Sequence, residues 1–265
     1  MWAYVSTLWV PKDGATAEEC EDAAAVVPVI ESDEPTDGPV SVAVADGASE
    51  SLLARPWARV LVESTVEAVR AKPEVLHSEA GFARVVLGAV DDWDVWLAAY
   101  IAEREETARP IKWYEQPGLE RGAYATLLAF HLTDVGLWHA AALGDSCLFQ
   151  VRADSLLRAF PVDTAVALGT SPALLNSRNR DDELIASKAG LAGGDYQEGD
   201  QFFLGTDALA HWFLTEVEQD DCPWEVLRDL SAAGSAEEFA EWVAAERAGG
   251  RMKNDDVTLV HVDLG

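Results

Sequence analysis

Acidic residues stand where the apolar segments of this chain begin or end. Five such places occur: Glu21-Asp22, Asp46-Gly47, Asp145, Thr206-Asp207 and Asp255-Asp256. A carboxylate at the rim of a sheet can point into a cleft while its strand stays anchored in the core. Several carboxylates that converge repel one another unless a hard cation neutralises them. Ligation by oxygen alone favours Mg²⁺ or Mn²⁺ over zinc, and a pair of such ions commonly hydrolyses phosphate esters.

Each of these places also has a plainer interpretation when it is taken alone. Asp46-Gly47 is a common turn signal, and Gly144-Asp145 suits a hairpin turn. Thr206 is a plausible helix N-cap. The remaining acidic pairs could be solvated turn residues in a chain with 47 acids. A functional interpretation therefore depends on the order of the sites and on the elements that position them.

The pattern of apolar residues predicts strands first, then helices, then a block of strands and a second group of helices. The expected strands span residues 2–10, 22–30 and 40–45, a four-run meander within 123–161, then 200–207 and 256–264. Helices are expected over 57–69, 78–106, 208–218, 223–230 and 236–250. Residues 107–122 are expected to form a loop, and 162–198 an irregular surface loop or flap.

This order favours an α+β protein. Strands do not alternate one for one with helices, so a doubly wound parallel sheet is disfavoured, and two antiparallel sheets flanked by helices fit the pattern. No internal repeat or shift in composition marks a second domain, so residues 1–265 are expected to form a single domain.

Composition excludes several classes of function. The formal net charge is −28, and the 19 Lys and Arg residues form no stripe, which argues against nucleic acid and against anionic membrane surfaces as partners. Hydrophobic residues make up 49% of the chain, so it is not a disordered acidic segment. Three distant cysteines predict neither a disulfide framework nor a zinc site. With no positively charged leader, a cytoplasmic location is expected.

Taken together, the sites resemble those of the metal-dependent, type-2C protein serine/threonine phosphatases, in particular the bacterial members of that family. The shared order is Glu-Asp opening a strand, an apolar strand ending in Asp-Gly, a Gly-Asp-Ser hairpin, a strand ending in Thr-Asp before a helix, and Asn-Asp-Asp-x-Thr opening the last strand. The segment Gly-Ala-Tyr-Ala-Thr, residues 122–126, also fits that family. The resemblance runs nearly from end to end of the chain.

The resemblance implies a four-layer α-β-β-α sandwich with a binuclear Mg²⁺/Mn²⁺ centre at one end. By motif position, Asp46 would bridge the two metals and the Gly47 carbonyl would ligate one of them. Asp207 and Asp255 would complete the shell of the first metal. In this scheme Asp46, Asp22 and Glu21 form the catalytic set, and a water between the ions attacks phosphorus.

The remaining site residues have secondary roles in this scheme. Glu21 and Asp22 would act mostly through metal-bound water, and Asp145 with Asp207 matches a weaker third metal. The implied partners are a phosphorylated protein substrate and a serine/threonine kinase.

This sequence departs from the family pattern at the phosphate-binding position. Many relatives have an arginine a few residues before Glu-Asp, whereas this chain has GATAEECED with only Lys12 nearby. Lysine supplies charge without a bidentate grip. His211 stands where relatives often have a further aspartate. Two alternatives therefore stay open: a catalytically weak or inactive regulatory module with this fold, and a hydrolase of small phosphate esters.

Overall fold

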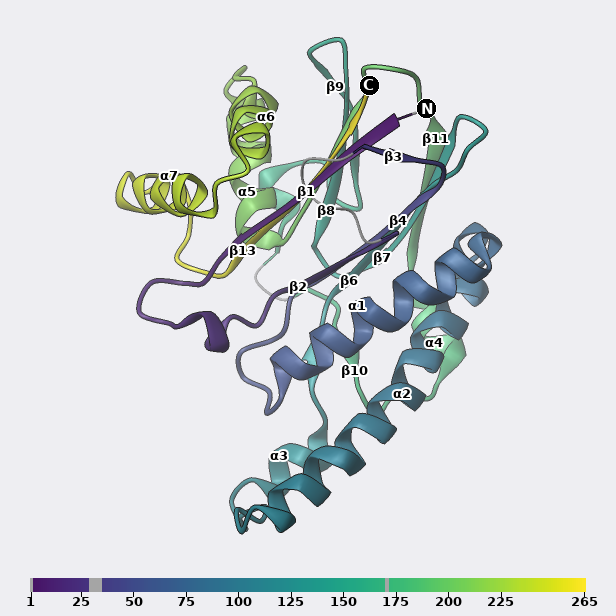
Figure 1. Cartoon of the computed structure of the whole chain (residues 1–265), viewed down its shortest axis with the longest axis vertical. Coiled ribbons are helices and arrows are strands. Elements are labelled where there is room, and N and C mark those ends of the chain that lie inside the picture. Colours follow the sequence, from purple (N-terminus) through teal and green to yellow (C-terminus); the bar gives the residue numbers. More distant parts are fainter. Residues whose placement is uncertain (1, 29–34, 170–171) are drawn as a thin grey trace.

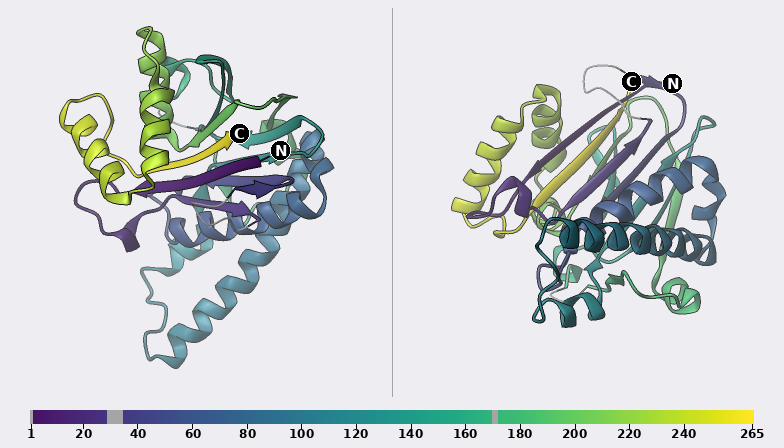
Figure 2. Two further views of the ribbon diagram at one scale, coloured as in Figure 1. Left: turned by 45° about the horizontal axis from the view of Figure 1, so that its top comes forward. Right: turned by 60° about the horizontal axis from the view of Figure 1, so that its bottom comes forward.

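A computed structural model of the chain describes residues 2–28, 35–169 and 172–265, and its strands form two large antiparallel sheets (Figure 1). The five-stranded sheet has the order β11-β7-β6-β4-β2, and the six-stranded sheet the order β3-β1-β13-β12-β8-β9. Helices cover the outer face of each sheet, as the left view of Figure 2 shows. The predicted α+β class is confirmed.

The five-stranded sheet contains β2 (Ala23–Val27), β4 (Val40–Ala45), β6 (Leu127–Leu132), β7 (Leu137–Leu143) and β11 (Gly190–Asp195). Helix α1 (Ala54–Ala71) lies directly on it, and α2 (Glu79–Glu106) packs against α1 and α4 (Asp182–Lys188). The far end of α2 projects beyond the sheets toward α3 (Gln116–Arg121) (Figure 1).

The six-stranded sheet contains β1 (Trp2–Val10), β3 (Thr36–Asp37), β8 (Cys147–Arg152), β9 (Ser155–Phe160), β12 (Gln201–Gly205) and β13 (Val257–Leu264). Its outer face carries α5 (Asp207–Glu218), α6 (Pro223–Ala233) and α7 (Ala236–Ala248). A small pair joins β5 (Tyr124–Ala125) to β10 (Leu175–Asn176). Short 3₁₀ turns span Ala17–Glu19, Pro73–His77 and Ala165–Ala167.

Strand β4 shows how the sandwich places the first predicted site residue. All six of its residues are buried, and their side chains alternate between two layers of core. Ala43 and Ala45 pack toward α1 and α2, whereas Val42 and Val44 pack between the two sheets. Because a strand covered on both faces is held firmly, the residue that follows it, Asp46, has a well-defined position.

The prediction of an irregular loop over residues 162–198 is wrong. This segment holds β10, α4 and β11, and β11 completes the edge of the five-stranded sheet beside β7. Strand β11 reads GLAGGD, which lacks β-branched residues because there is little room beside it. A Cβ on Gly194 would lie 3.0 Å from the Trp138 indole nitrogen. Asp181 caps the N-terminus of helix α4, because its carboxylate accepts the Leu184 N–H at 2.9 Å.

Two further expectations differ in detail. Residues 107–122 contain the short helix α3 rather than loop alone. The strand expected over 22–30 is observed as Ala23–Val27, and the part of that prediction over residues 29–30 lies outside the described residues. In the described part of the chain, no helix is both long and apolar enough to cross a membrane.

Candidate functional site

The backbone of Asp46 is fixed by the segment that resembles the glycine–threonine motif. The Asp46 N–H donates to the Thr126 hydroxyl at 3.0 Å, and the Thr126 N–H donates to the Asp46 carbonyl at 2.8 Å. The Thr126 hydroxyl also lies 2.8 Å from the Ser146 hydroxyl, in the Gly-Asp-Ser hairpin. With both backbone groups of Asp46 engaged, only its carboxylate is left to face other partners.

Gly47 is required by the close approach of two other segments. A Cβ at this position would lie 2.8 Å from the Glu21 carbonyl oxygen and 3.1 Å from the carbonyl carbon and oxygen of Ala54. Both neighbours are backbone atoms, so neither can move away cheaply. Because Gly47 has no side chain, the Glu21 backbone and the first turn of α1 both approach it closely, next to Asp46.

Thr206 links the two sheets at the end of the sandwich where the predicted acidic residues lie, which we call the rim. It occupies the N-cap position of α5, but its hydroxyl makes no capping bond. Instead it donates to the Asp22 carboxylate at 2.8 Å and accepts the Thr258 N–H at 3.1 Å. The sequence predicts Thr206 as an ordinary N-cap, whereas the structure uses it to hold Asp22 against the six-stranded sheet.

Asp256 holds the loop that precedes Asp22. Its side chain is 4% exposed and accepts the backbone N–H groups of Lys12 at 2.8 Å and Glu21 at 2.7 Å. The carbonyl of its neighbour Asp255 accepts from Arg247. These contacts were not foreseen from the sequence, because a buried acidic residue in a turn looks the same as a solvated one.

The predicted carboxylates come together and perturb one another. Burial, with the charges of neighbouring aspartates added, raises the pKa of Asp22 and of Asp46 well above the usual range. Burial and then the charge of Asp207 raise the pKa of Asp255, and raise that of Asp145 to about 6. In the protein alone, the ionised forms of these four carboxyl groups are therefore disfavoured. A bound cation would offset their burial and their mutual repulsion and so favour the ionised forms.

Three buried carboxylate oxygens at this rim have no hydrogen-bond partner within the described residues. They are the Oδ1 atoms of Asp22, Asp145 and Asp207. An unpartnered buried oxygen is costly, so each is available to a ligand that can accept its lone pairs. Oxygen donors with surplus negative charge match the chemistry of Mg²⁺ and Mn²⁺.

Two lysines neutralise part of this charge. The Lys253 ammonium contacts Asp207 Oδ2, and although burial disfavours its charge, the hydrogen bond and charge of Asp207 raise the pKa of Lys253. The Lys12 ammonium lies 3.2 Å from Glu21 Oε2 and 2.9 Å from the Ser49 hydroxyl. Lys12, the predicted phosphate ligand, is therefore engaged with Glu21 in this structure.

The arrangement is not closed around an ion. Across residues 2–28, 35–169 and 172–265, no group of three or more His, Cys, Asp or Glu side chains is disposed to hold one metal. The oxygen donors and the negative charge fit divalent cations, but the Lys253 ammonium contacts the carboxylate of Asp207, one of the expected ligands. The individual ligand assignments stay predictions.

The two helix-covered antiparallel sheets define the fold of the type-2C protein phosphatases. The photosystem II phosphatase PBCP is similar over 99% of both chains, with a TM-score of 0.59 and 15% identity. The Mycobacterium tuberculosis serine/threonine phosphatase PstP is similar over 100% of this chain and 99% of its own, with a TM-score of 0.58 and 17% identity.

A third similar structure is the PstP catalytic domain in complex with two manganese ions. It is 18% identical, with a TM-score of 0.58, and the match covers 99% of this chain and 98% of that one. No protein-family model and no curated protein sequence matches this chain. The chain therefore has the type-2C phosphatase fold, and the resemblance seen in the sequence is confirmed at that level.

Proposed function

We propose that this protein is a Mg²⁺- or Mn²⁺-dependent protein serine/threonine phosphatase. The observation that supports this most directly is the convergence of buried carboxylates with unpartnered oxygens at one rim of a type-2C phosphatase fold. In the proposal, two metals and a more weakly bound third metal would be held by these residues: Asp46, the Gly47 carbonyl, Asp207, Asp255, Asp22, Glu21 and Asp145.

The chain's own groups have distinct tasks in this proposal. Asp46 would be a central metal ligand, since Thr126 holds its backbone on both sides and leaves the carboxylate free. Thr206 orients Asp22, and Asp256 sets the position of Glu21. When bound, the metals would supply Lewis-acid stabilisation and would lower the pKa of the water that attacks phosphorus.

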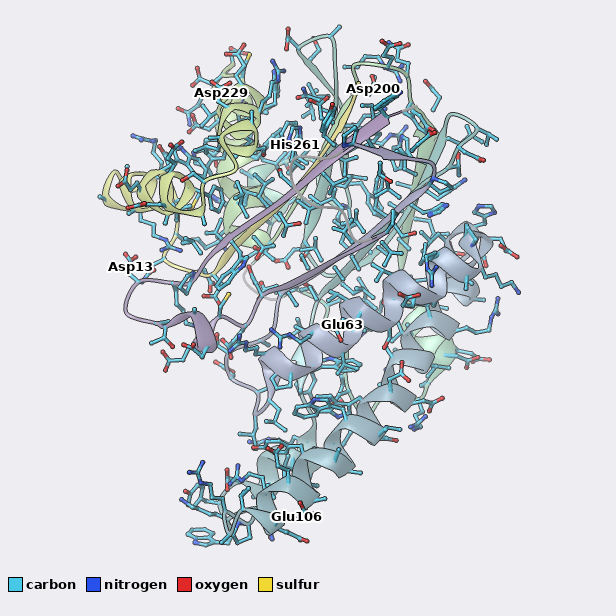
Figure 3. All side chains as sticks on the ribbon, viewed as in Figure 1. Asp13, Glu63, Glu106, Asp200, Asp229 and His261 are labelled. Carbon is cyan, nitrogen blue, oxygen red and sulfur yellow. The ribbon has the colours of Figure 1, made fainter. Side chains whose placement is uncertain are left out.

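The test is hydrolysis of p-nitrophenyl phosphate and of a phosphothreonine peptide, with Mn²⁺ and with EDTA. We expect Mn²⁺-dependent turnover that falls by at least about a thousandfold in Asp46→Ala, because the proposed bridging ligand is lost. Asp229→Ala is the matched control, since Asp229 is exposed on α6 (Figure 3). Activity that survives EDTA or Asp46→Ala would refute the binuclear mechanism.

A second candidate is an inactive module with the phosphatase fold, used for regulation or binding. The specific observation in its favour is Lys253, whose ammonium already neutralises the expected ligand Asp207. Absence of turnover on both substrates with saturating Mn²⁺ would select this candidate. Turnover of the aryl phosphate without the peptide would instead select a hydrolase of small phosphate esters.

The partners and the location belong to the same proposal. The substrate would be a phosphorylated protein, with a serine/threonine kinase as the opposing enzyme, and the location would be cytoplasmic. The net charge of −28 supports neither nucleic acid nor an anionic membrane as a ligand.

A further inference from the structure

We infer that Arg55, in the first turn of α1, binds the phosphate group of the substrate. This inference rests on the proposed phosphatase function and assigns one binding residue within it. The expected family arginine before Glu21-Asp22 is missing from this sequence. A dianionic phosphate approaching clustered carboxylates still needs a cation, and guanidinium is the group that grips it with two parallel hydrogen bonds.

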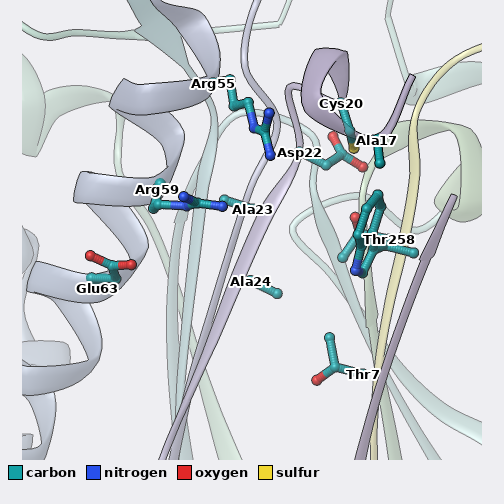
Figure 4. Close-up of a pocket in the computed structure, with 11 residues that line it drawn as sticks. Thr7, Ala17, Cys20, Asp22, Ala23, Ala24, Arg55, Arg59, Glu63 and Thr258 are labelled. Carbon is teal, nitrogen blue, oxygen red and sulfur yellow. The ribbon is translucent and has the colours of Figure 1, made fainter. Parts of the chain in front are cut away.

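Packing places Arg55 at the site. Gly47 lies against the Ala54 backbone, so the residue after Ala54 starts beside the Asp46-Gly47 turn. Arg55 lines two adjoining clefts: one also contains Asp22 and Thr258, and the other contains Lys12, Ser49 and Glu21. Figure 4 shows the Arg55 side chain projecting from α1 toward the side of Asp22.

The charge of Arg55 is not matched by a carboxylate. Its guanidinium donates to the Glu18 carbonyl, and among the described residues no acidic side chain forms an ion pair with it. Among the other thirteen arginines, seven pair with carboxylates: Arg70, Arg104, Arg152, Arg180, Arg228, Arg247 and Arg251. An arginine left without a carboxylate partner, in a chain with 47 acids, has its remaining donors available to an anion.

The N-terminus of α1 also favours a bound phosphate group. Leu53 at the N-cap position makes no side-chain capping bond, and the first turn contains no acidic residue. The positive end of an 18-residue helix therefore adds to the charge of Arg55 at this cleft. Lys12 lines the same cleft, but its ammonium is already bound to Glu21 and Ser49.

The experiment compares variants of full-length protein loaded with Mn²⁺. Titration with inorganic phosphate by calorimetry gives the dissociation constant, and peptide hydrolysis gives KM and kcat. We expect Arg55→Ala to weaken phosphate binding and raise KM by about 10- to 100-fold, as for loss of a charge-assisted bidentate contact. Arg55→Gln keeps a donor for the Glu18 carbonyl, so it separates loss of the charge from damage to the loop.

Two variants on the same helix serve as comparisons. Arg59 lines the first cleft one turn further along, and Arg70 is exposed and paired with Glu67. Both alanine variants should bind phosphate within twofold of the wild-type protein. Phosphate affinity within twofold of wild type in both Arg55 variants, or an equal loss in Arg59→Ala, overturns the inference.

Failure of this inference can be distinguished from failure of the proposed function. Phosphate titration needs no turnover, so a wild-type protein that binds phosphate through Arg55 but hydrolyses nothing refutes only the phosphatase proposal. A wild-type protein that hydrolyses the peptide, with phosphate affinity insensitive to Arg55, refutes only the assignment of Arg55. A Mn²⁺-loaded protein with no affinity for phosphate also overturns that assignment.

Discussion

Replacing Lys253 by methionine should tighten Mn²⁺ binding. The Lys253 ammonium contacts Asp207 Oδ2 and also lies in the field of Asp145 and Asp255. A divalent cation that uses Asp207 must displace this ammonium or share the carboxylate with it. Methionine keeps the length and most of the volume of the side chain while removing the charge.

The size of the effect follows from the environment of the ion pair. The Lys253 and Asp207 side chains are 44% and 15% exposed, so the pair is neither fully exposed nor fully buried. An exposed ion pair contributes less than about 1 kcal/mol to stability, whereas breaking a buried pair costs about 3–5 kcal/mol. We take about 1–2 kcal/mol, which corresponds to about a 5- to 30-fold decrease in the Mn²⁺ dissociation constant. The metal-free variant should lose unfolding free energy of the same order, because Asp207 loses its partner.

Calorimetric titration of chelator-treated protein with Mn²⁺ measures the affinity, and urea unfolding in EDTA measures the stability. Lys72→Met is the matched control, because Lys72 is exposed just beyond the end of α1. An unchanged or weaker Mn²⁺ affinity in Lys253→Met would refute the view that the lysine competes with the metal.

Three other predictions concern the frame of the site and the core. Gly47→Ala should destabilise the protein by about 1–3 kcal/mol and weaken Mn²⁺ binding, since its Cβ would collide with the Glu21 and Ala54 backbones; urea unfolding and metal titration check both. Asp256→Ala should cost about 2–4 kcal/mol by urea unfolding, with Asp256→Asn closer to wild type, because two partly buried N–H groups lose their acceptor. Burial lowers the pKa of His261 to about 3, so as the pH falls below about 6.5 this imidazole becomes protonated in the unfolded chain but not in the folded one. The free energy of unfolding should therefore decrease on acidification by up to about 1.4 kcal/mol per pH unit. His261→Phe should flatten that slope in unfolding measured from pH 7 to 5, and an unchanged slope would contradict the assignment.

Much of the fold could be predicted because strong local patterns coincide with buried elements. The apolar run over 40–45 is β4, and the helix expected over 78–106 is α2, Glu79–Glu106. Strand β11 could not be predicted, because Gly193 and Gly194 reflect the space that Trp138 occupies on the neighbouring strand. That constraint lies in tertiary packing, and nothing within the segment itself indicates it.

The candidate site shows the same division between local and tertiary information. The acidic residues at strand ends are visible in the sequence, and the structure brings the charges of Asp22, Asp145, Asp207 and Asp255 within reach of Asp46. The contacts of Lys253 and Arg55 were missed. Each depends on a segment more than 30 residues away, the first on Asp207 and the second on Glu18.

The rim draws its residues from both sheets, since Asp46 follows a strand of one and Asp207 a strand of the other. The separation of these carboxylates is therefore set by how closely the two sheets pack, through side chains such as Val44 and Phe202. The affinity for a cation, if one binds as proposed, therefore depends on the packing between the sheets. A conservative substitution deep between the sheets should then change that affinity while leaving every ligand intact. Natural variation in that core would then alter the proposed metal binding from a distance.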